Sequence, residues 1–401
     1  MATYGDDLLQ RIYDARARAE AFFHSLKFND GWRYTTQHDV ETYPGAVLYG
    51  TWSSILGLHL LGYDFSPDER EWAMTKLLRH RREDGTFLGI GLDQDRHPKS
   101  LEYLILHCSN YAQGAAMALD PEYDYRSSYF DAFLDADFLA RWLEGRSFQR
   151  PWEEGNNVVN VAGYLALCDD HDIPSANDRL RQMLTWHYNH QNPKTGGFDN
   201  FKYASEKTMT QAMAGAVHNY HIHLYLHEPF HHEALTAKWA THFLFQGMLT
   251  SCLSIDFTEL GIRTLPYADE PQELAWSLFD HAEALLDAQR DDGGWFELDR
   301  AIPSGGNGFR DQEVASISYG TWFRLCSLGM IAIVLLGDHP DNWRFRKTLG
   351  MGYAPEYWPQ LPETIKIEPT PNNIKLKYMR KALPNRAKKW AIRTAAKIIM
   401  R

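Results

Sequence analysis

The sequence predicts an all-α fold, an α/α toroid in which an inner ring of buried helices lies inside an outer ring of amphipathic helices. Three observations support this prediction. Nearly continuous apolar runs alternate with amphipathic runs along the chain. The period-two alternation of apolar and polar residues that marks β-strands is almost absent. Helix-like runs repeatedly end in a polar turn, a glycine and an aromatic residue, which indicates repeated helical hairpins.

A helix that is apolar on all sides is buried on all sides, so the apolar runs are expected inside. These runs are Ala46–Leu61, Asn110–Leu119, Asn156–Leu167, Met209–Leu226 and Ser316–Leu336. The amphipathic runs expected outside them are Asp68–Arg81, Asn177–His190, Glu233–Phe245 and Glu273–Gln289, and a first helix is expected over Asp6–Phe28. The alternation of the two kinds of run predicts the two rings.

The most complete turn is Gln289–Trp295, Gln-Arg-Asp-Asp-Gly-Gly-Trp, and weaker copies are Arg82–Phe87 and Gln191–Phe198. Glycine after the last helical turn adopts positive φ and ends the helix. The aromatic residue that follows is expected to fold back against the helix just completed. Comparable spacing of the copies supports a repeated unit.

Composition is that of a soluble globular protein, with 23% charged and 44% apolar residues among 401. No stretch of about 20 apolar residues predicts a membrane-spanning helix, and the N-terminus carries no secretory signal pattern. The four cysteines are far apart in apolar runs and are expected to be buried thiols in a reducing compartment. These features predict a cytoplasmic protein.

Charge divides the chain into an acidic body and a basic tail. The formal net charge is −11. Ile374–Arg401 holds ten Lys or Arg residues and no Asp or Glu, which leaves 31 basic and 52 acidic residues, a net charge of −21, on the rest. We expect the toroid at 1–340, a proline-rich linker at 341–373 and a basic amphipathic helix at 374–401. No nucleic-acid partner is expected, because an acidic body repels phosphates.

The tail predicts contact with an anionic membrane surface. On a helical wheel its basic residues fall on one side and alanine and isoleucine on the other, as in helices that lie in the membrane interface. Such a tail would hold the protein peripherally at the inner face of the membrane. A solvated or disordered tail is the alternative.

The turn at Gln289–Trp295 resembles the turns of α/α toroids, the terpenoid-cyclase/prenyltransferase-like and six-hairpin glycan-processing superfamilies. The resemblance covers roughly Asp6 to His339. It implies the toroid fold, but many chemistries share that fold, so it implies no single activity.

Polar residues on buried helices must pair internally or face a cavity, and this rule selects the candidate site. The first candidate cluster lies around Trp152. Glu153 is its candidate catalytic residue, and the residues expected to bind substrate are Trp152, Glu154, Asn156, Asn157 and Asn160. Glu153 and the three asparagines follow the spacing i, i+3, i+4, i+7, which places them on one helix face. Glu153 would act as acid or base, the amides would bind sugar hydroxyls or a uronate, and the indole would stack on the ring. Alternatively, Glu153 or Glu154 caps the helix start, and the asparagines tie neighbouring helices together.

His218, Tyr220 and His221 form a second cluster, expected to transfer protons at the cavity. Core or surface histidines are the alternative. No HExxH or paired-cysteine signature is present, and the histidine pairs lie on different helix faces, so we expect no metal. No cofactor is expected.

Asp256 is the candidate second carboxylate, although it could instead cap a helix start. The expected cavity walls are Tyr49, Trp52, His107, Tyr319 and Trp322. The tetrapeptide Tyr-Gly-Thr-Trp occurs twice, at 49–52 and 319–322, each time at the head of an apolar run. Core packing of these aromatic residues is the alternative.

These candidates favour a carbohydrate-active enzyme, a glycoside hydrolase, polysaccharide lyase or uronyl epimerase. Its substrate would be an intracellular or membrane-associated glycan such as a lipid-linked saccharide. A hydrolase would pair Glu153 with Asp256. A lyase or epimerase would neutralise a sugar carboxylate with Asn or Arg and move protons with Tyr220, His218 and His221.

Two alternatives belong to other classes. One is a terpenoid or isoprenoid cyclase-like enzyme, although the Asp-x-Asp-Asp motif that the resemblance would require is absent. The nearest segments are Asp93–Asp95, Asp135–Asp137 and Cys168–Asp172. The other is a non-catalytic toroid that serves as a binding protein or scaffold.

Overall fold

The computed structural model describes residues 4–93, 99–203, 205–229, 231–246, 249–297, 315–345 and 358. Over these ranges the chain is predominantly helical, with a short antiparallel pair formed by β1 (Lys27–Phe28) and β2 (Gly31–Trp32). The prediction of an all-α fold is therefore confirmed for this part of the chain. The predicted tail helix and most of the predicted linker lie outside the described residues.

The helices fall into a buried and a covering set. The buried helices are α2 (Ala46–Leu60), α4 (Leu101–Leu119), α7 (Pro151–Asp170), α9 (Glu206–Tyr225), α11 (Ser251–Thr264) and α13 (Ser318–Leu336). The covering helices are α1 (Tyr4–Ser25), α3 (Pro67–Leu78), α6 (Ala136–Glu144), α8 (Ala176–His190), α10 (Glu233–Leu244) and α12 (Pro271–Asp287). The short elements are α5 (Ser128–Asp131) and the 3₁₀ turns η1 (Ala132–Leu134), η2 (Leu265–Tyr267) and η4 (Pro340–Asn342).

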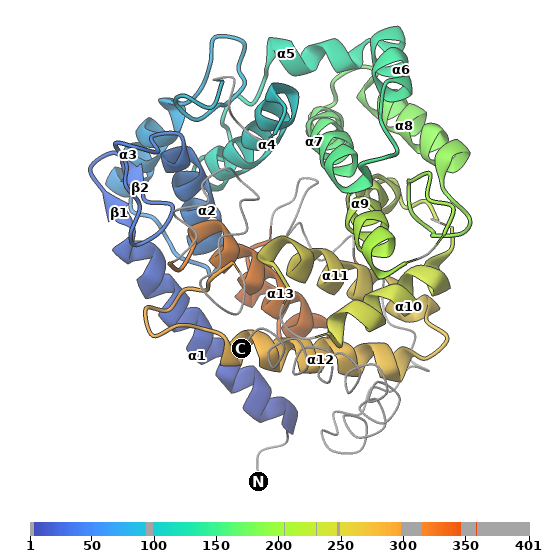
Figure 1. Ribbon diagram of the computed structural model, residues 1–401. Coiled ribbons are helices and arrows are strands. Elements are labelled where there is room, and N and C mark those ends of the chain that lie inside the picture. Colours follow the sequence, from blue (N-terminus) through green and yellow to red (C-terminus); the bar gives the residue numbers. More distant parts are fainter. Residues whose placement is uncertain are drawn as a thin grey trace, which may run out of the picture.

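The six buried helices contact one another in chain order. Helix α2 contacts α4, and the contacts continue through α7, α9 and α11 to α13, which packs against α2 again. Most covering helices pack on the outside of their neighbours in this series, for example α3 on α2 and α4, and α8 on α7 and α9, while α6 packs on α8 and η1. Figure 1 shows the same arrangement, with α1, α3, α8, α10 and α12 outside the series.

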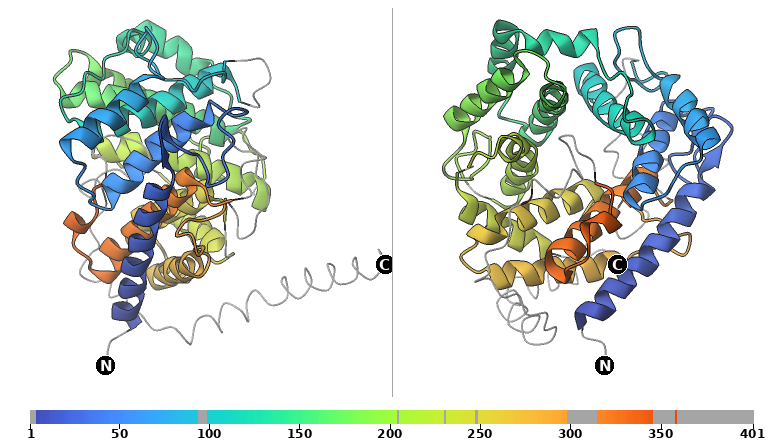
Figure 2. Two further views of the ribbon diagram at one scale, coloured as in Figure 1. Left: turned by 90° about the vertical axis from the view of Figure 1, so that its left-hand side faces the viewer. Right: turned by 180° about the vertical axis from the view of Figure 1, so that it is seen from behind.

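The first and last helices of the chain are neighbours. Helix α1 contacts α13, α2 and α12, and Figure 2 shows it running beside them when the molecule is seen from behind. The Tyr13 hydroxyl donates to Asp338 Oδ1 at 2.7 Å, and the Tyr4 hydroxyl donates to Glu283 Oε1 at 2.7 Å. These bonds join residues more than 270 positions apart and fix α1 against α12 and the segment that follows α13.

The glycine turns have the predicted conformation. Gly85, Gly196 and Gly293 adopt φ values of +81°, +75° and +87°. The aromatic residues that follow them, Phe87, Phe198 and Trp295, are buried. The indole nitrogen of Trp295 donates to the carbonyl of Leu285 at 2.7 Å, so the ring folds back on α12 as expected.

A hydroxyl on the next buried helix binds the backbone of the aromatic residue in most of these turns. The Thr321 hydroxyl accepts from Trp295 N, and the Ser109 hydroxyl accepts from Phe87 N. The same bond joins Trp32 N to Thr51 at 3.2 Å, after the Asn-Asp-Gly turn that follows α1. Thr51 and Thr321 are the threonines of the repeated Tyr-Gly-Thr-Trp segments, so the tetrapeptide repeat serves to dock a turn onto a buried helix.

Helix α11 departs from the predicted pattern. It is buried along almost its whole length, yet it carries Asp256, Glu259 and Arg263 as well as apolar residues. Because buried helices were expected to be apolar on all sides, α11 was not predicted among them. Glu259 pairs with Arg263 on the same helix and with His221 on α9, whereas Asp256 faces His218 on α9 without a hydrogen bond to it.

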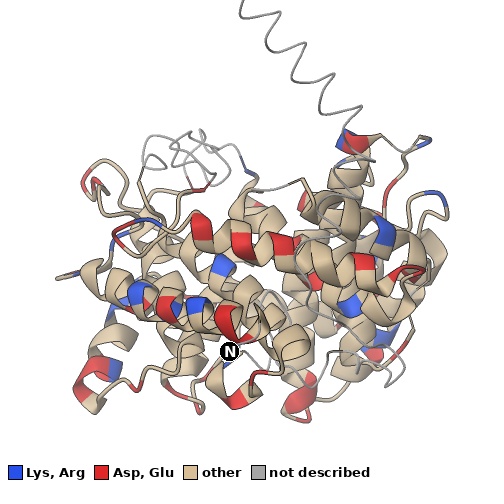
Figure 3. Ribbon diagram, turned by 90° about the horizontal axis from the view of Figure 1, so that it is seen from below, with Lys and Arg blue, Asp and Glu red and all other residues tan. Residues whose placement is uncertain are grey.

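The outer surface of the described structure is mixed in charge. Seen from below, acidic and basic residues are interspersed along the helices (Figure 3). Among the helices of the described chain, α13 is long and apolar enough to cross a membrane, and 78% of its most apolar window is buried inside the structure.

Candidate functional site

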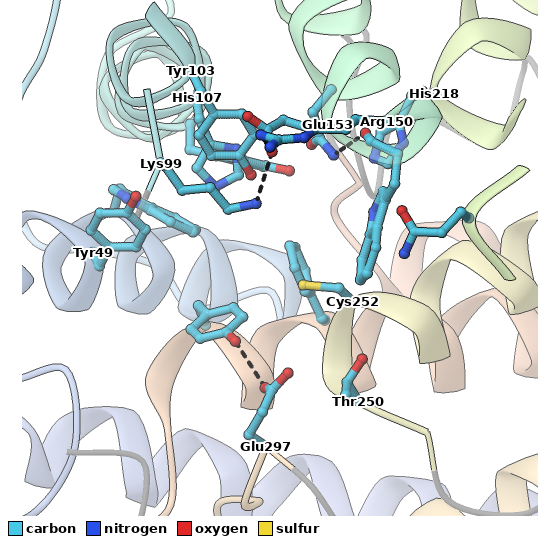
Figure 4. Close-up of a pocket in the computed structure, with 17 residues that line it drawn as sticks. Tyr49, Lys99, Tyr103, His107, Arg150, Glu153, His218, Thr250, Cys252 and Glu297 are labelled. Carbon is cyan, nitrogen blue, oxygen red and sulfur yellow. Dashed lines mark hydrogen bonds and ion pairs between the residues drawn. The ribbon is translucent and has the colours of Figure 1, made fainter. Parts of the chain in front are cut away.

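A pocket of about 400 Å³ opens among the six buried helices, and each of them contributes to its walls (Figure 4). This volume falls in the range of ordinary ligand sites. Most of the lining comes from residues on the helices themselves, namely Tyr49, Trp52, Tyr103, His107, Tyr111, Trp152, Glu153, Asn156, Gln211, His218, Cys252, Tyr319 and Phe323. Lys99, Arg150, Thr250 and Glu297 complete it from helix ends and loops.

Aromatic rings form much of one wall. Trp52 stacks on Tyr111 with centroids 4.6 Å apart, and Tyr103 stacks on His107 at 5.2 Å. Tyr103, His107 and Tyr111 are four residues apart on α4, so one face of that helix presents all three. Burial lowers the pKa of His107 to about 3, so its imidazole is neutral at physiological pH. A wall of this kind binds flat apolar faces, including those of sugar rings.

A charged group lies beside the aromatic wall, with Lys99 Nζ 4.9 Å from the centre of the Tyr103 ring. Lys99 Nζ is 3.5 Å from Glu153 Oε2, and Arg150 Nη1 is 4.0 Å from the same oxygen. Glu153 and Arg150 come from the start of α7, while Lys99 precedes α4. Two cations beside one carboxylate leave a net positive charge at this part of the pocket, which favours an anionic ligand.

Glu297 supplies a second carboxylate to the pocket. It is 3% exposed and lies two residues beyond the Gly-Gly-Trp turn. Its Oε2 accepts hydrogen bonds from the Ser251 hydroxyl at 2.5 Å and the Tyr319 hydroxyl at 2.8 Å. In Figure 4 it lies across the pocket from Glu153.

His218 lines the pocket but is oriented toward α11. Its Nδ1 is 2.6 Å from the carbonyl of Ala214, so Nδ1 carries the proton and Nε2 bears the lone pair. Nε2 is 3.9 Å from Asp256 Oδ1 and is buried. Burial lowers the pKa of His218 to about 3 and, with the charge of Glu259, raises the pKa of Asp256 well above its usual value. The two groups therefore form a neutral pair beside the pocket.

The other predicted proton-transfer residues lie outside the pocket lining. The Tyr220 hydroxyl donates to the carbonyl of Gly196 at 2.5 Å, in the turn after α8. His221 Nε2 is 3.0 Å from Glu259 Oε1, which also binds Arg263. Burial acts to raise the pKa of Glu259, but the charges of His221 and Arg263 outweigh it and hold the pKa at about 2. Asp256 does not line the pocket either.

Several predicted binding residues make structural contacts instead of lining the pocket. Glu154 pairs with Arg146 at 3.2 Å, and Asn157 donates to Glu154. Asn160 accepts from Asn110 on α4, and Trp322 is buried against Trp52. Of the predicted binding residues, the pocket brings together Trp152, Asn156, Tyr49, Trp52, His107 and Tyr319.

Lys99, Arg150 and Glu297, which complete the pocket from helix ends and loops, were not among the predicted site residues. Arg150 adjoins the predicted cluster and Glu297 follows the strongest turn, so proximity to those motifs was the available signal. Lys99 lies near neither motif, so nothing in the sequence indicated that it lines the pocket. Tyr103 and Tyr111 could have been found from their spacing of four around His107.

Within the described ranges no group of three or more His, Cys, Asp or Glu residues is placed to hold a metal ion. Compared with models of protein families, with curated proteins and with solved structures, the chain shows no match. The fold class therefore stands on the helices themselves, and the candidate function depends on the chemistry of the pocket.

Proposed function

We propose that the chain is a glycan-processing enzyme with an α/α-toroid catalytic domain, and that its pocket binds an acidic sugar residue and transfers a proton at it. The closed series of contacts from α2 to α13 and back supports the toroid. One observation carries the function: a single pocket joins stacking aromatic rings to Lys99 and Arg150.

The two kinds of residue match the two parts of an acidic sugar. Trp152, a partly buried ring of the pocket lining, offers a flat surface for a pyranose, and the amide of Asn156 offers bonds to hydroxyls. Lys99 and Arg150 would bind the sugar carboxylate as a charge-assisted pair. Neutralising that carboxylate makes the adjacent C–H bond more acidic, which is the chemical requirement of a lyase or uronyl epimerase.

Proton abstraction has more support than hydrolysis. The hydrolase hypothesis paired Glu153 with Asp256, but Asp256 lies behind His218 and outside the pocket lining. A hydrolase needs two carboxyl groups that both reach the scissile bond. For a hydrolase, Glu153 and Glu297 would be the remaining pair of carboxyl groups in the pocket lining.

The isoprenoid alternative has less support than the saccharide. Aromatic walls suit both ligands, but a cyclase needs an acidic proton donor in its cavity. Asp169 and Asp170 belong to the nearest acidic segment, and both accept from the Tyr225 hydroxyl away from the pocket lining. The pocket instead holds two cations beside Glu153.

A thermal-denaturation screen tests the proposal. Oligouronates should raise the melting temperature of the full chain, while polyprenyl diphosphates and neutral oligosaccharides should raise it less. A ligand at 100 times its Kd adds about 2.7 kcal/mol to the free energy of unfolding. Stabilisation by the isoprenoids alone would contradict the proposal. Stabilisation by oligouronates without any turnover would favour the non-catalytic binding protein.

We further propose that Ile374–Arg401 binds an anionic membrane surface and holds the enzyme at the cytoplasmic face. Its ten basic residues without an acid support this proposal. The substrate would then be a membrane-associated or lipid-linked glycan.

A further inference from the structure

Glu297 is fixed more firmly than the other carboxylate of the pocket. Hydroxyls from two different buried helices, Ser251 on α11 and Tyr319 on α13, donate to the same oxygen, Oε2. The guanidinium of Arg324 binds the backbone carbonyl of Glu297 at 2.9 Å. A side chain and a backbone held in this way keep the carboxylate at a defined place on the wall of the pocket.

We propose that Glu297 is the general base of the reaction, and that Ser251 and Tyr319 are positioning residues that hold its carboxylate in place. This inference rests on the proposed function. Hydroxyl donors stabilise a carboxylate over the neutral acid, because only the charged form accepts both bonds fully. A fixed base within reach of the substrate is the first requirement of proton abstraction.

The step balances without any further reactant. The C–H bond next to the sugar carboxylate breaks, and its proton forms an O–H bond on Glu297. The electron pair moves into the carboxylate of the sugar, which becomes an enolate held by Lys99 and Arg150. In elimination the neighbouring C–O bond breaks, the enolate electron pair forms the C=C bond, and the leaving oxygen takes the proton from Glu297. In epimerisation a solvent water gives a proton to the opposite face, and the hydroxide that remains takes the proton from Glu297, so the water is regenerated.

The other groups of the pocket are less suited to this role. His218 directs Nε2 toward Asp256, and Glu153 faces the two cations that the substrate carboxylate requires. Cys252 lies in the pocket, but burial raises the pKa of its thiol well above the usual value, and the charge of Glu297 adds to this effect. The thiol is therefore protonated and is a weak base.

Exchange of the substrate C–H with solvent tests the inference. Oligouronates are incubated in D₂O with the full chain, and proton NMR follows the loss of the signal of the C–H next to the carboxylate. Glu297→Gln should slow this loss at least about 1000-fold, with less than a few-fold change in oligouronate affinity. Glu283→Gln is the matched control, because Glu283 makes the same phenol–carboxylate bond with Tyr4 on the outer surface.

The positioning role has its own readout. Ser251→Ala or Tyr319→Phe removes one donor from the carboxylate, so the pKa of the base rises and it is ionised only at higher pH. The acid limb of the kcat/KM profile should move up by about one pH unit in each variant. If Ser251 and Tyr319 had only a structural role, the variants would be slower but the acid limb of the kcat/KM profile would stay at the same pH.

The outcomes separate the two proposals. If wild type catalyses neither exchange nor turnover on any oligouronate, the proposed function is overturned and the inference with it. If wild type is active and Glu297→Gln, with an unchanged melting temperature, exchanges the proton equally fast, the inference alone is overturned.

Discussion

Asp256 is a fully buried carboxyl group whose two oxygens have no hydrogen-bond partner among the described residues. An ionised carboxylate in that position would be strongly destabilising. Burial, with the charge of Glu259 as a smaller cause, raises its pKa well above the usual 3.8, so the folded protein keeps it protonated. Beside it, His218 is neutral for the same reason, because burial lowers its pKa to about 3.

Replacing Asp256 with Asn should change how stability depends on pH. A raised folded-state pKa stabilises the fold fully below the unfolded pKa of about 4, and this contribution is lost as pH rises toward the folded value. Asparagine is neutral at every pH, so the variant has no such pH-dependent contribution to its free energy of unfolding. The free energy of unfolding of Asp256→Asn relative to wild type should therefore increase from pH 5 to pH 8, by up to about 1.4 kcal/mol per pH unit.

Urea denaturation at a series of pH values measures this difference. Asp120→Asn serves as the control, because Asp120 is an exposed residue that caps α4. A constant difference between wild type and Asp256→Asn across the pH range would show that Asp256 is ionised in the folded state.

The glycine turns are the elements that set the repeat, and Gly293 is the most restricted of them. Its φ is +87°, and a Cβ atom there would lie 2.1 Å from the carbonyl oxygen of Arg18 on α1. Gly293→Ala should lower the free energy of unfolding by at least about 2 kcal/mol, through both strain and displacement of α1. Urea denaturation checks this value.

Gly145→Ala is the matched control. Gly145 has φ −78° at the end of α6, and an added Cβ would meet its neighbours at 3.4 Å or more. It should change the free energy of unfolding by less than about 0.5 kcal/mol. Equal effects of the two substitutions would mean that the turn does not fix the position of α1.

The threonines of the repeated tetrapeptide bind the turn backbones. Thr321→Val keeps the volume and removes the acceptor of Trp295 N, a buried group. We expect a loss of about 1–3 kcal/mol in the free energy of unfolding, because the buried N–H is then unpaired. Thr75→Val, at an exposed position of α3 where the hydroxyl bonds to Glu71 O, should cost clearly less. Equal losses of free energy of unfolding in Thr321→Val and Thr75→Val would contradict the docking role of Thr321.

The helices and turns were predictable from sequence because they depend on local patterns. Apolar runs located α2, α4, α7, α9 and α13, and glycine followed by an aromatic residue located the turns. Helix α11 was missed because Glu259 and Arg263 make it look exposed, while their partner His221 is far away in sequence.

The candidate site was only partly predictable for a related reason. Glu153 and Asn156 line the pocket, but Asn157, the next residue, and Asn160, one turn further along the helix, meet neighbouring side chains. Helical spacing alone does not say which neighbour a face meets. Lys99 and Glu297 lie outside the helices, where no periodicity places them, and only the packed structure brings them to the pocket.

At the scale of the whole molecule, the contact series brings the first and last helices together and places one pocket among the six buried helices. Each helix contributes at least one lining residue, so the pocket exists only when the series is closed. Substitutions that open the α2–α13 contact, which closes the series, are therefore expected to affect ligand binding as well as stability.

The basic tail gives a separate prediction for the whole chain. Replacing Lys389, Arg393 and Lys397 together with Gln should weaken binding to vesicles of phosphatidylcholine and phosphatidylserine, since each basic residue contributes on the order of 1 kcal/mol near an anionic surface. Co-sedimentation of the full chain measures the effect, with vesicles of phosphatidylcholine alone as control. Equal sedimentation of wild type with both vesicles would contradict membrane binding through charge.

The measurement that tests the central claim most directly is calorimetric titration with a matched pair of ligands, an oligouronate and the same oligosaccharide with its carboxyl groups reduced to alcohols. Wild type should bind the acidic form at least about tenfold tighter, a difference of about 1.4 kcal/mol. Lys99→Ala should remove this preference, and Lys76→Ala, which alters a surface pair with Asp30, should keep it. Equal affinity of wild type for both ligands would contradict a pocket that recognises an acidic sugar.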